Sequence, residues 1–234
     1  LEGTPVHQLW GLDLTKEVHS SFTIGIDTIE TMRFKLKEEP GWPVYKIKLG
    51  TREDAQIIQS LRQETEALFR VDANCGWKAD EALALSCELS RQGVEFIEQP
   101  LDPDKDQAQE RLYQDSVLPL IADESCVVET DVLQCVDRFH GVNIKLSKCG
   151  GLTPARRMVT TARDQGLKVM VGCMTESSVG ISAAAQLAPL IDYADLDGAV
   201  LLAEDTAQGV VVDRGSLTFP DLPGCGIHDF KCEG

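Results

Sequence analysis

Eight short runs of β-branched and apolar residues recur along the chain, and helical patterns fill most of the intervals. The spacing is about 25 residues, close to one strand–helix unit. Near-continuous apolar strands that alternate with helices predict a parallel sheet, and eight of them favour a closed α/β barrel. A doubly wound open sheet is the alternative, although no Gly-x-Gly-x-x-Gly follows the first run. The runs are Val18–Ile26, Val44–Leu49, Phe69–Asn74, Val94–Gln99, Leu120–Glu124, Val142–Leu146, Leu167–Gly172 and Tyr193–Asp197.

Four intervals carry clear helix signals. One of them opens with Thr153 as a candidate N-cap and Pro154 at the first helical position. The expected helices are Arg52–Leu68, Asp80–Arg91, Thr153–Gln165 and Ser177–Leu187. The catalytic barrel is expected over 18–198, with a linker or the end of a preceding domain at 1–17 and a C-terminal return segment at 199–234.

Composition excludes several classes of partner. The formal net charge is −16, whereas nucleic acids and anionic membranes require clustered positive charge. No apolar run reaches the roughly 18 residues that a transmembrane helix needs. The 8 cysteines are scattered without a Cys-x-x-Cys pair, so we interpret them as reduced residues of a cytoplasmic protein.

Acidic residues follow three consecutive predicted strands. Asp72, Glu98 and Asp123 stand at the carboxyl ends of the third, fourth and fifth runs, and barrel active sites lie at those ends. Three carboxylates held together repel one another unless a cation neutralises them. Oxygen ligands suit Mg²⁺, or alternatively Mn²⁺, and not zinc. A structural ion-pair network is the competing interpretation for each acid taken alone.

Lysines flank this acidic group in the sequence. Alternation places Lys46 and Lys48 on one face of the second strand, and Lys145 lies on the sixth. Lys148 follows closely, but it falls off the shared face or beyond the strand end, which favours Lys145. A metal and a neighbouring ammonium lower the pKa of a lysine, so one lysine can act as a base. Two opposed lysines permit removal of an α-proton on one face of a carbon and return on the other, through a metal-stabilised enediolate.

These motifs together resemble the enolase superfamily, and within it the muconate-lactonising subgroup. The resemblance rests on Lys46-Ile47-Lys48, Asp72-Ala73-Asn74, Glu98-Gln99-Pro100, Asp123-Glu124-Ser125 and Asn143-Ile144-Lys145, in order and spacing over the whole barrel. Asp195-Leu196-Asp197 is similar to the Asp-x-Asp signature of dipeptide epimerases, of the L-Ala-D/L-Glu epimerase type.

The resemblance implies a role for each residue. Lys48 and Lys145 are the acid/base catalysts, and Asp72, Glu98 and Asp123 bind the metal. The pair Asp195 and Asp197 holds the substrate's α-ammonium group, with stabilisation of the barrel end as the alternative. Lys46 lowers the pKa of the base or touches a substrate carboxylate, with a structural role as the alternative. Thr175 and Glu176 belong to a substrate-lining loop, with helix capping as the alternative for Glu176. Asn74 and Glu124 are expected to support the metal ligands, with turn formation and ion pairing as their alternatives.

The expected activity is inversion of the α-carbon of a dipeptide's C-terminal residue by two-base proton transfer. An N-acylamino-acid racemase, an o-succinylbenzoate synthase or a cycloisomerase of the same subgroup is the alternative, and so is an inactive barrel fragment. Schiff-base chemistry at Lys145 is less consistent with three adjacent acids. The family's barrel is (β/α)7β with an N-terminal α+β capping domain, which we expect to be missing from this chain. The expected partner is a small-molecule dipeptide, and a homo-oligomer remains open.

Overall fold

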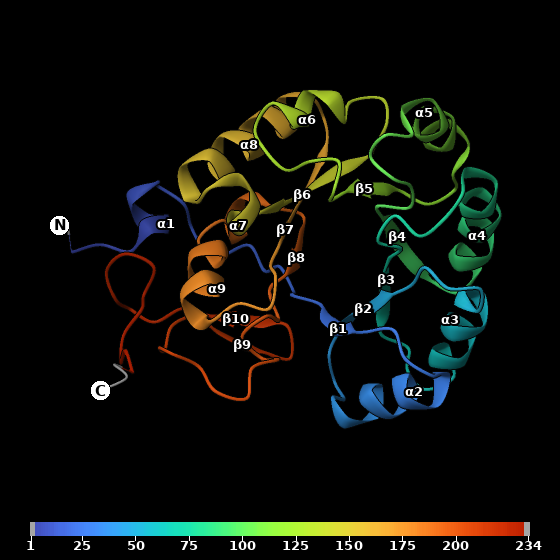
Figure 1. Ribbon diagram of the computed structural model, residues 1–234. Coiled ribbons are helices and arrows are strands. Elements are labelled where there is room, and N and C mark those ends of the chain that lie inside the picture. Colours follow the sequence, from blue (N-terminus) through green and yellow to red (C-terminus); the bar gives the residue numbers. More distant parts are fainter. Residues whose placement is uncertain (1–2, 232–234) are drawn as a thin grey trace.

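The computed structural model describes residues 3–231, and its centre is an eight-stranded parallel sheet with strands in sequence order. The sheet curves into a barrel, viewed along its axis in Figure 1. This confirms the predicted barrel and excludes the open doubly wound sheet. The strands are β1 Phe22–Ile24, β2 Val44–Lys48, β3 Leu68–Asp72, β4 Val94–Glu98, β5 Leu120–Ala122, β6 Gly141–Lys145, β7 Lys168–Gly172 and β8 Tyr193–Asp195.

Closure between β8 and β1 depends on residues just before β1. Ser20 forms an isolated parallel bridge with Ala194, and the backbone N–H of Ser21 donates to the carbonyl of Ala194 at 3.1 Å. The Ser20 hydroxyl also accepts from the N–H of Leu196 at 2.7 Å. Among residues 3–231, only this short pairing joins β8 to the residues before β1, so the barrel is nearly but not fully closed by strand pairing.

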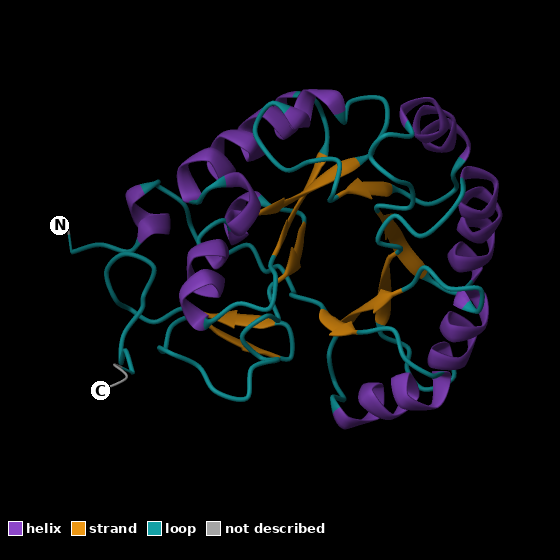
Figure 2. Cartoon of the chain, in the orientation of Figure 1, coloured by secondary structure: helices purple, strands orange, loops and turns teal. Residues whose placement is uncertain are grey.

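Helices surround the barrel on the outside (Figure 2). Their apolar faces pack against the outward side chains of the strands, such as Ile47, Val71 and Ile97, which are all 0% exposed. The helices of the ring are α2 Ile29–Glu38, α3 Asp54–Arg62, α4 Ala79–Arg91, α5 Asp106–Asp115, α6 Asp131–Gln134, α7 Leu146–Cys149, α8 Leu152–Asp164, α9 Ser178–Ala185 and the 3-10 turn Ala188–Leu190.

Two helix predictions were wrong at their ends. The helix expected to run to Leu68 stops at Arg62, whose guanidinium donates to the carbonyls of Thr65 and Ala67 and fixes a turn; Leu68 begins β3. The cap of α8 is Gly151, not Thr153, because the backbone there has a φ of 116°, which glycine adopts without a Cβ clash. Thr153 and Pro154 therefore lie inside the first turn.

Alternation along the strands divides the core in two. One face of each strand packs against the helices, and the other points into the barrel. Phe96, Ile121 and Met170 form a small separate apolar cluster, with Tyr193 packed against it. Phe96 lies two residues before Glu98 on the same face of β4. This apolar plug therefore supports the polar layer above it.

The tail turns back along the outside of the barrel. The strands β9 Val211–Asp213 and β10 Ser216–Thr218 form an antiparallel hairpin, which lies between α9 and α2 in Figure 1. Gly224 bridges Pro5, next to the short helix α1 Val6–Leu9. No helix within residues 3–231 is long and apolar enough to span a bilayer. The seven cysteines in those residues are free, and Cys232 lies outside them.

Candidate active site

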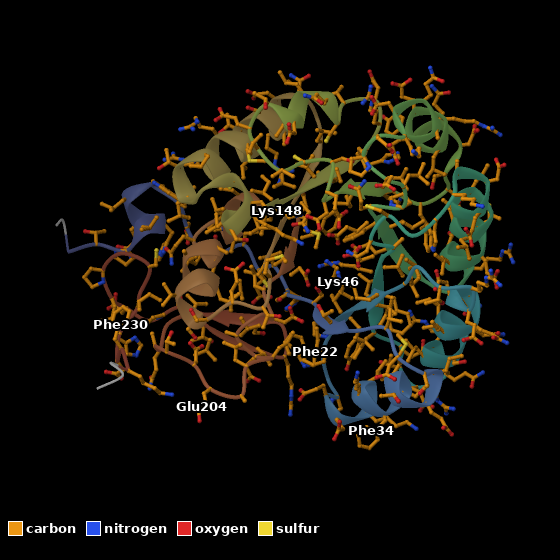
Figure 3. All side chains as sticks on the ribbon, in the orientation of Figure 1. Phe22, Phe34, Lys46, Lys148, Glu204 and Phe230 are labelled. Carbon is orange, nitrogen blue, oxygen red and sulfur yellow. The ribbon has the colours of Figure 1, made fainter. Side chains whose placement is uncertain are left out.

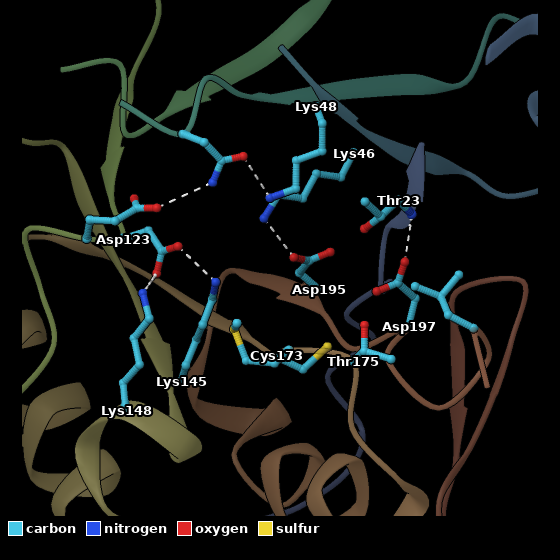
Figure 4. Close-up of a pocket in the computed structure, with 14 residues that line it drawn as sticks. Thr23, Lys46, Lys48, Asp123, Lys145, Lys148, Cys173, Thr175, Asp195 and Asp197 are labelled. Carbon is cyan, nitrogen blue, oxygen red and sulfur yellow. Dashed lines mark hydrogen bonds and ion pairs between the residues drawn. The ribbon is translucent and has the colours of Figure 1, made fainter. Parts of the chain in front are cut away.

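The predicted site residues gather at the carboxyl ends of the strands, around a pocket of about 450 Å³. Lys46 lies near the middle of the barrel in Figure 3, and Figure 4 shows the residues that line the pocket. The lining residues are Thr23, Lys46, Lys48, Asn74, Asp123, Glu124, Lys145, Lys148, Cys173, Met174, Thr175, Asp195, Asp197 and Leu201.

Asp72, Glu98 and Asp123 form one buried acidic group. A carboxylate oxygen from each lies within 4.8 Å of the others, and the three residues are at most 1% exposed. The pairing of β3 with β4 places Asp72 beside Glu98, and Asp123 follows the end of β5. Oε2 of Glu98 is buried and accepts no hydrogen bond from the described residues, although Nζ of Lys46 lies 2.8 Å away. An all-oxygen donor set with an unsatisfied oxygen fits a hard divalent cation.

The charges in this group are unequally compensated. Burial would raise the pKa of Asp72, but the ammonium groups of Lys46 and Lys48 lower it to about 2. Burial and the neighbouring Asp72 raise the pKa of Glu98 to about 7. A cation at the three carboxylates would stabilise the ionised form of Glu98 against the burial and the repulsion that raise its pKa.

Lys46 connects the acidic group to β8. Its Nζ lies 2.8 Å from Asp195, 2.8 Å from Glu98 and 3.1 Å from Asp72, and the residue is 1% exposed. Burial lowers the pKa of Lys46, but these three carboxylates raise it well above its usual value. Lys46 is therefore a fixed ammonium among acids and is unsuited to accept a proton.

Lys48 and Lys145 approach the pocket from opposite sides. In the strand order, β2 and β6 are separated by β3–β5 on one side and by β7, β8 and β1 on the other. Nζ of Lys48 lies 2.7 Å from Asp72, and Nζ of Lys145 lies 2.8 Å from Asp123. Burial lowers the pKa of Lys145, but Asp123 raises it overall. If Asp123 coordinates a metal ion, its negative charge no longer stabilises the ammonium form of Lys145. The pKa of Lys145 then falls, and Lys145 becomes a better base.

Lys148 also reaches Asp123, which the sequence reasoning did not anticipate. It lies beyond β6, in α7, yet its Nζ is 2.7 Å from Oδ1 of Asp123 (Figure 4). Alternation applies only while the chain is extended, and the helical turn after Lys145 returns Lys148 to the same side. Strand alternation therefore predicts that Lys145 faces the pocket, as the structure shows, but it does not predict that Lys148 also contacts Asp123.

The two acids at the end of β8, Asp195 in the strand and Asp197 just beyond it, have different partners. Asp195 accepts from Lys46 at 2.8 Å and from the Ser21 hydroxyl at 2.6 Å. Burial would raise the pKa of Asp195, but Lys46 holds it below its usual value. Asp197 accepts from the backbone N–H of Thr23 at 2.6 Å, and burial together with Asp195 raises its pKa to about 7. Asp197 therefore has the greater need of a cationic ligand.

Polar neighbours hold the catalytic groups in place. Asn74 accepts from Lys48 at 3.1 Å and donates to Glu124 at 3.3 Å, so the two predicted supporting residues contact each other beside the pocket. Asn143 donates to Oε1 of Glu98 at 2.7 Å. The side-chain oxygen of Gln99 accepts from the N–H of Asp123 at 2.9 Å. The roles of Asn143 and Gln99 were missed, although both sit beside predicted site residues in the sequence.

The loop after β7 contributes less than expected. Thr175 lines the pocket, together with Met174. Glu176 does not line it, because its carboxylate turns back and accepts from the N–H of Met174 at 2.9 Å. The helix α9 begins at Ser178 with Ser177 as its cap, so Glu176 is not the cap residue either.

The fold and site define an α/β-barrel enzyme with one lysine on each side of a buried acidic group that could hold a metal ion. A family model described as enolase C-terminal domain-like matches residues 30–228. The chain belongs to this family.

Relatives and solved structures agree with this assignment. The chain is 51% identical over 226 residues to an L-Ala-D/L-amino acid epimerase of Flavobacterium johnsoniae, covering 97% of this chain and 67% of that protein. A Maribacter epimerase of the same name is 54% identical over 228 residues, with the same coverage of 97% and 67%. A dipeptide epimerase of Cytophaga hutchinsonii, solved with Mg and the dipeptide D-Ala-L-Val, superposes with a TM-score of 0.91 at 27% identity. That match covers 98% of this chain and 66% of that one, so the chain spans about two thirds of the length of these proteins.

Proposed function

We propose that the protein is a metal-dependent dipeptide epimerase that inverts the α-carbon of the substrate's C-terminal residue. The observation that carries this proposal is the placement of Lys48 and Lys145 on opposite strands, with the acidic group between them. A carbon held between two lysines can lose a proton on one face and gain one on the other. Relatives named L-Ala-D/L-amino acid epimerase and a solved dipeptide epimerase support this reading.

A cation held by the acidic group would orient the carboxylate end of the substrate. Asp72, Glu98 and Asp123 would hold one divalent cation, taken as Mg²⁺, with Mn²⁺ as the alternative. When bound, the cation would supply positive charge that stabilises the substrate carboxylate, whose negative charge would grow as the α-proton leaves. The ammonium of Lys46 contacts Asp72 and Glu98 and limits their mutual repulsion.

The two lysines move the proton. Nζ of Lys48, as the free amine, removes the α-proton on its face, and the ammonium of Lys145 returns a proton to the opposite face. In the reverse direction the roles exchange. The side chain of Lys145 is 7% exposed and that of Lys48 is 25% exposed, so both reach the pocket while most bulk water is excluded.

The amino end of the substrate points toward β8. In the closed strand order β8 lies opposite β4, so its acids face the pocket across from Glu98. The ammonium group of a dipeptide would neutralise Asp197, whose pKa is raised to about 7 by burial and Asp195. Thr175 and Met174 line the pocket beside this position.

One observation favours a second candidate. Asp195 is already neutralised by Lys46, which reduces the need for an ammonium-bearing substrate. An N-acylamino-acid racemase of the same subgroup would use the same lysines and cation without that group. Asp197, which has no ion-pair partner within residues 3–231, is the reason to prefer the dipeptide.

The test is α-proton exchange in D₂O. The chain is incubated with Mg²⁺ and a set of L,L-dipeptides beginning with L-Ala-L-Glu, and with their N-acetylated forms. We expect one deuterium at the C-terminal residue of the free dipeptides, with inversion, and none after EDTA. Exchange confined to the N-acylated compounds would favour the racemase, and exchange that survives EDTA would contradict a metal-dependent reaction.

A cytoplasmic location and a homo-oligomer remain predictions. The scattered cysteines favour a reducing compartment. Fractionation of cells and light scattering of the purified protein test these two expectations.

A further inference from the structure

Asp123 is held by two lysines, one on each carboxylate oxygen. Nζ of Lys145 lies 2.8 Å from Oδ2, and Nζ of Lys148 lies 2.7 Å from Oδ1 (Figure 4). Asp123 is 1% exposed, and Lys145 and Lys148 are the ion-pair partners of its carboxylate among residues 3–231. The two lysines differ in setting, because the Lys145 side chain is 7% exposed and that of Lys148 is 23% exposed.

The other two predicted ligands follow one pattern. Oδ1 of Asp72 accepts from the backbone N–H of Asn74 at 3.0 Å, and Oδ2 faces Lys46 and Lys48. Oε1 of Glu98 accepts from Asn143 at 2.7 Å, and Oε2 faces Lys46. In both residues, one carboxylate oxygen accepts from a backbone or amide N–H that takes no part in proton transfer. The other carboxylate oxygen faces a lysine ammonium.

Asp123 fits this pattern only if Lys148 is the holding donor. Its Oδ2 faces Lys145, as the second oxygens of Asp72 and Glu98 face the other lysines. Its Oδ1 has no backbone or amide donor within the described chain, and Lys148 takes that place. Lys145 cannot serve both purposes, because a base must leave the carboxylate to reach the substrate.

We propose that Lys148 is a positioning residue that holds Oδ1 of Asp123, so that Oδ2 stays directed at the metal site when Lys145 moves to the substrate. The local chain supports this role. Lys148 belongs to the single turn α7, directly after β6, and the turn ends at Gly150 with a φ of 93°. The backbone of Lys148 is therefore held a short distance from the strand end that carries Lys145, and its ammonium reaches Asp123 from there.

This inference rests on the metal site of the proposed function but not on its substrate. The test is the affinity of the full chain for Mn²⁺, measured without substrate by the electron paramagnetic resonance signal of free Mn²⁺. For K148M we expect an affinity about 10-fold or more below that of the unchanged protein, the usual effect of removing a residue that orients a metal ligand. Loss of a nearby positive charge would by itself strengthen cation binding, so a decrease isolates positioning from charge.

Three further variants complete the comparison. K148R keeps a charged donor and is expected to retain most of the affinity, while K148Q repeats the removal with a polar side chain in case methionine disturbs the fold. K168M is the matched control, because Lys168 pairs with Asp192 at 3.5 Å at the opposite end of the barrel. Unchanged or tighter Mn²⁺ binding in K148M and K148Q would overturn the role of Lys148 and leave the epimerase proposal intact. Absence of Mn²⁺ binding in the unchanged protein would overturn the metal site, and with it both proposals.

Discussion

Asp195 and Asp197 lie two residues apart at the end of β8, but only Asp195 has an ion-pair partner among residues 3–231. Nζ of Lys46 lies 2.8 Å from Oδ2 of Asp195, whereas Asp197 accepts a hydrogen bond from the backbone N–H of Thr23. Asp197 is 3% exposed, and burial and Asp195 raise its pKa to about 7. The fold therefore keeps a poorly compensated acid at the place where a substrate ammonium would bind.

We predict that D197N stabilises the substrate-free protein above neutral pH. Because the folded pKa of Asp197 is about 7 against an ordinary value of 3.8, the folded state binds the extra proton between these values. The free energy of unfolding therefore decreases as the pH rises from 3.8 to about 7, because the unfolded state has lost this proton and the folded state still holds it. Above that range the destabilisation by Asp197 is complete. The upper limit of the gain is about 4 kcal/mol, and each kcal/mol raises the Tm by about 2–4 °C in a chain of this size. Thermal unfolding of both proteins at about pH 4 and about pH 8 measures the difference.

D195N is the matched control for this prediction. Asp195 is paired with Lys46, so its removal leaves a buried ammonium with one partner fewer, and we expect a lower Tm at both pH values. Both variants should slow the reaction of free dipeptides. Equal stability changes in D195N and D197N would contradict the different electrostatic settings of the two acids.

A second prediction concerns the division of work between the lysines. K48M and K145M should each lower the rate of inversion by at least about 10²-fold, because each removes one of two proton-transfer groups. Each variant should still exchange the α-proton of one stereoisomer with solvent, and the two variants should differ in which one. Deuterium incorporation into L,L- and L,D-dipeptides, separated by chiral chromatography, distinguishes them.

The controls for the lysine variants address the metal. Lys145 contacts Asp123 and Lys48 contacts Asp72, so Mn²⁺ binding is measured in both variants alongside exchange. Loss of exchange from both stereoisomers in a variant that still binds Mn²⁺ would contradict the two-base mechanism.

The gathering of polar residues at the carboxyl ends of the strands could be predicted from the sequence, because the order of strands along the chain is also their order around the barrel. The strand–helix rhythm gave the order of the strands, and alternation gave the inward face, so Asp72 and Glu98 were expected together and are together. Seven of the eight observed strands are shorter than the predicted runs, and Asp123 and Asp197 lie just beyond β5 and β8. Both residues still line the pocket, because they directly follow the strand ends, before the chain turns toward the next helix.

Contacts made through turns could not be predicted in the same way. Lys148 reaches Asp123 because one helical turn follows β6, and no strand rule describes that turn. Glu176 was expected in the pocket or at a helix cap, but its own loop offers the N–H of Met174 as a nearer partner. Side-chain hydrogen bonds of this kind depend on loop geometry, which residue spacing alone does not determine.

A third prediction is that metal affinity depends on pH around neutrality. Burial and Asp72 raise the pKa of Glu98 to about 7, so a proton competes with the cation for this carboxylate. Affinity for Mg²⁺ should be nearly constant above that value and fall below it, by up to about tenfold for each pH unit. Titration calorimetry across this range measures it. Affinity that rises toward acid pH would contradict the assignment of Glu98 as a ligand.

The last prediction concerns the space that Gly172 leaves for Asn143. A Cβ added at Gly172 would lie 2.6 Å from Oδ1 and 2.8 Å from Nδ2 of Asn143, so the amide would have to move. Asn143 donates to Oε1 of Glu98 at 2.7 Å, and the movement would release this carboxylate. We therefore expect G172A to lower Mn²⁺ affinity by about 10-fold, as residues that orient a metal ligand usually do.

Two comparisons make the Gly172 argument specific. G25A is the control, because a Cβ at Gly25 meets nothing within 4 Å, and it should bind Mn²⁺ like the unchanged protein. N143A removes the same hydrogen bond without crowding, so it should lower the affinity by a similar factor, and G172A combined with N143A should be little worse than either alone. If the two effects were independent and multiplied, the glycine would be acting through the backbone of β7 and not through the amide that holds Glu98.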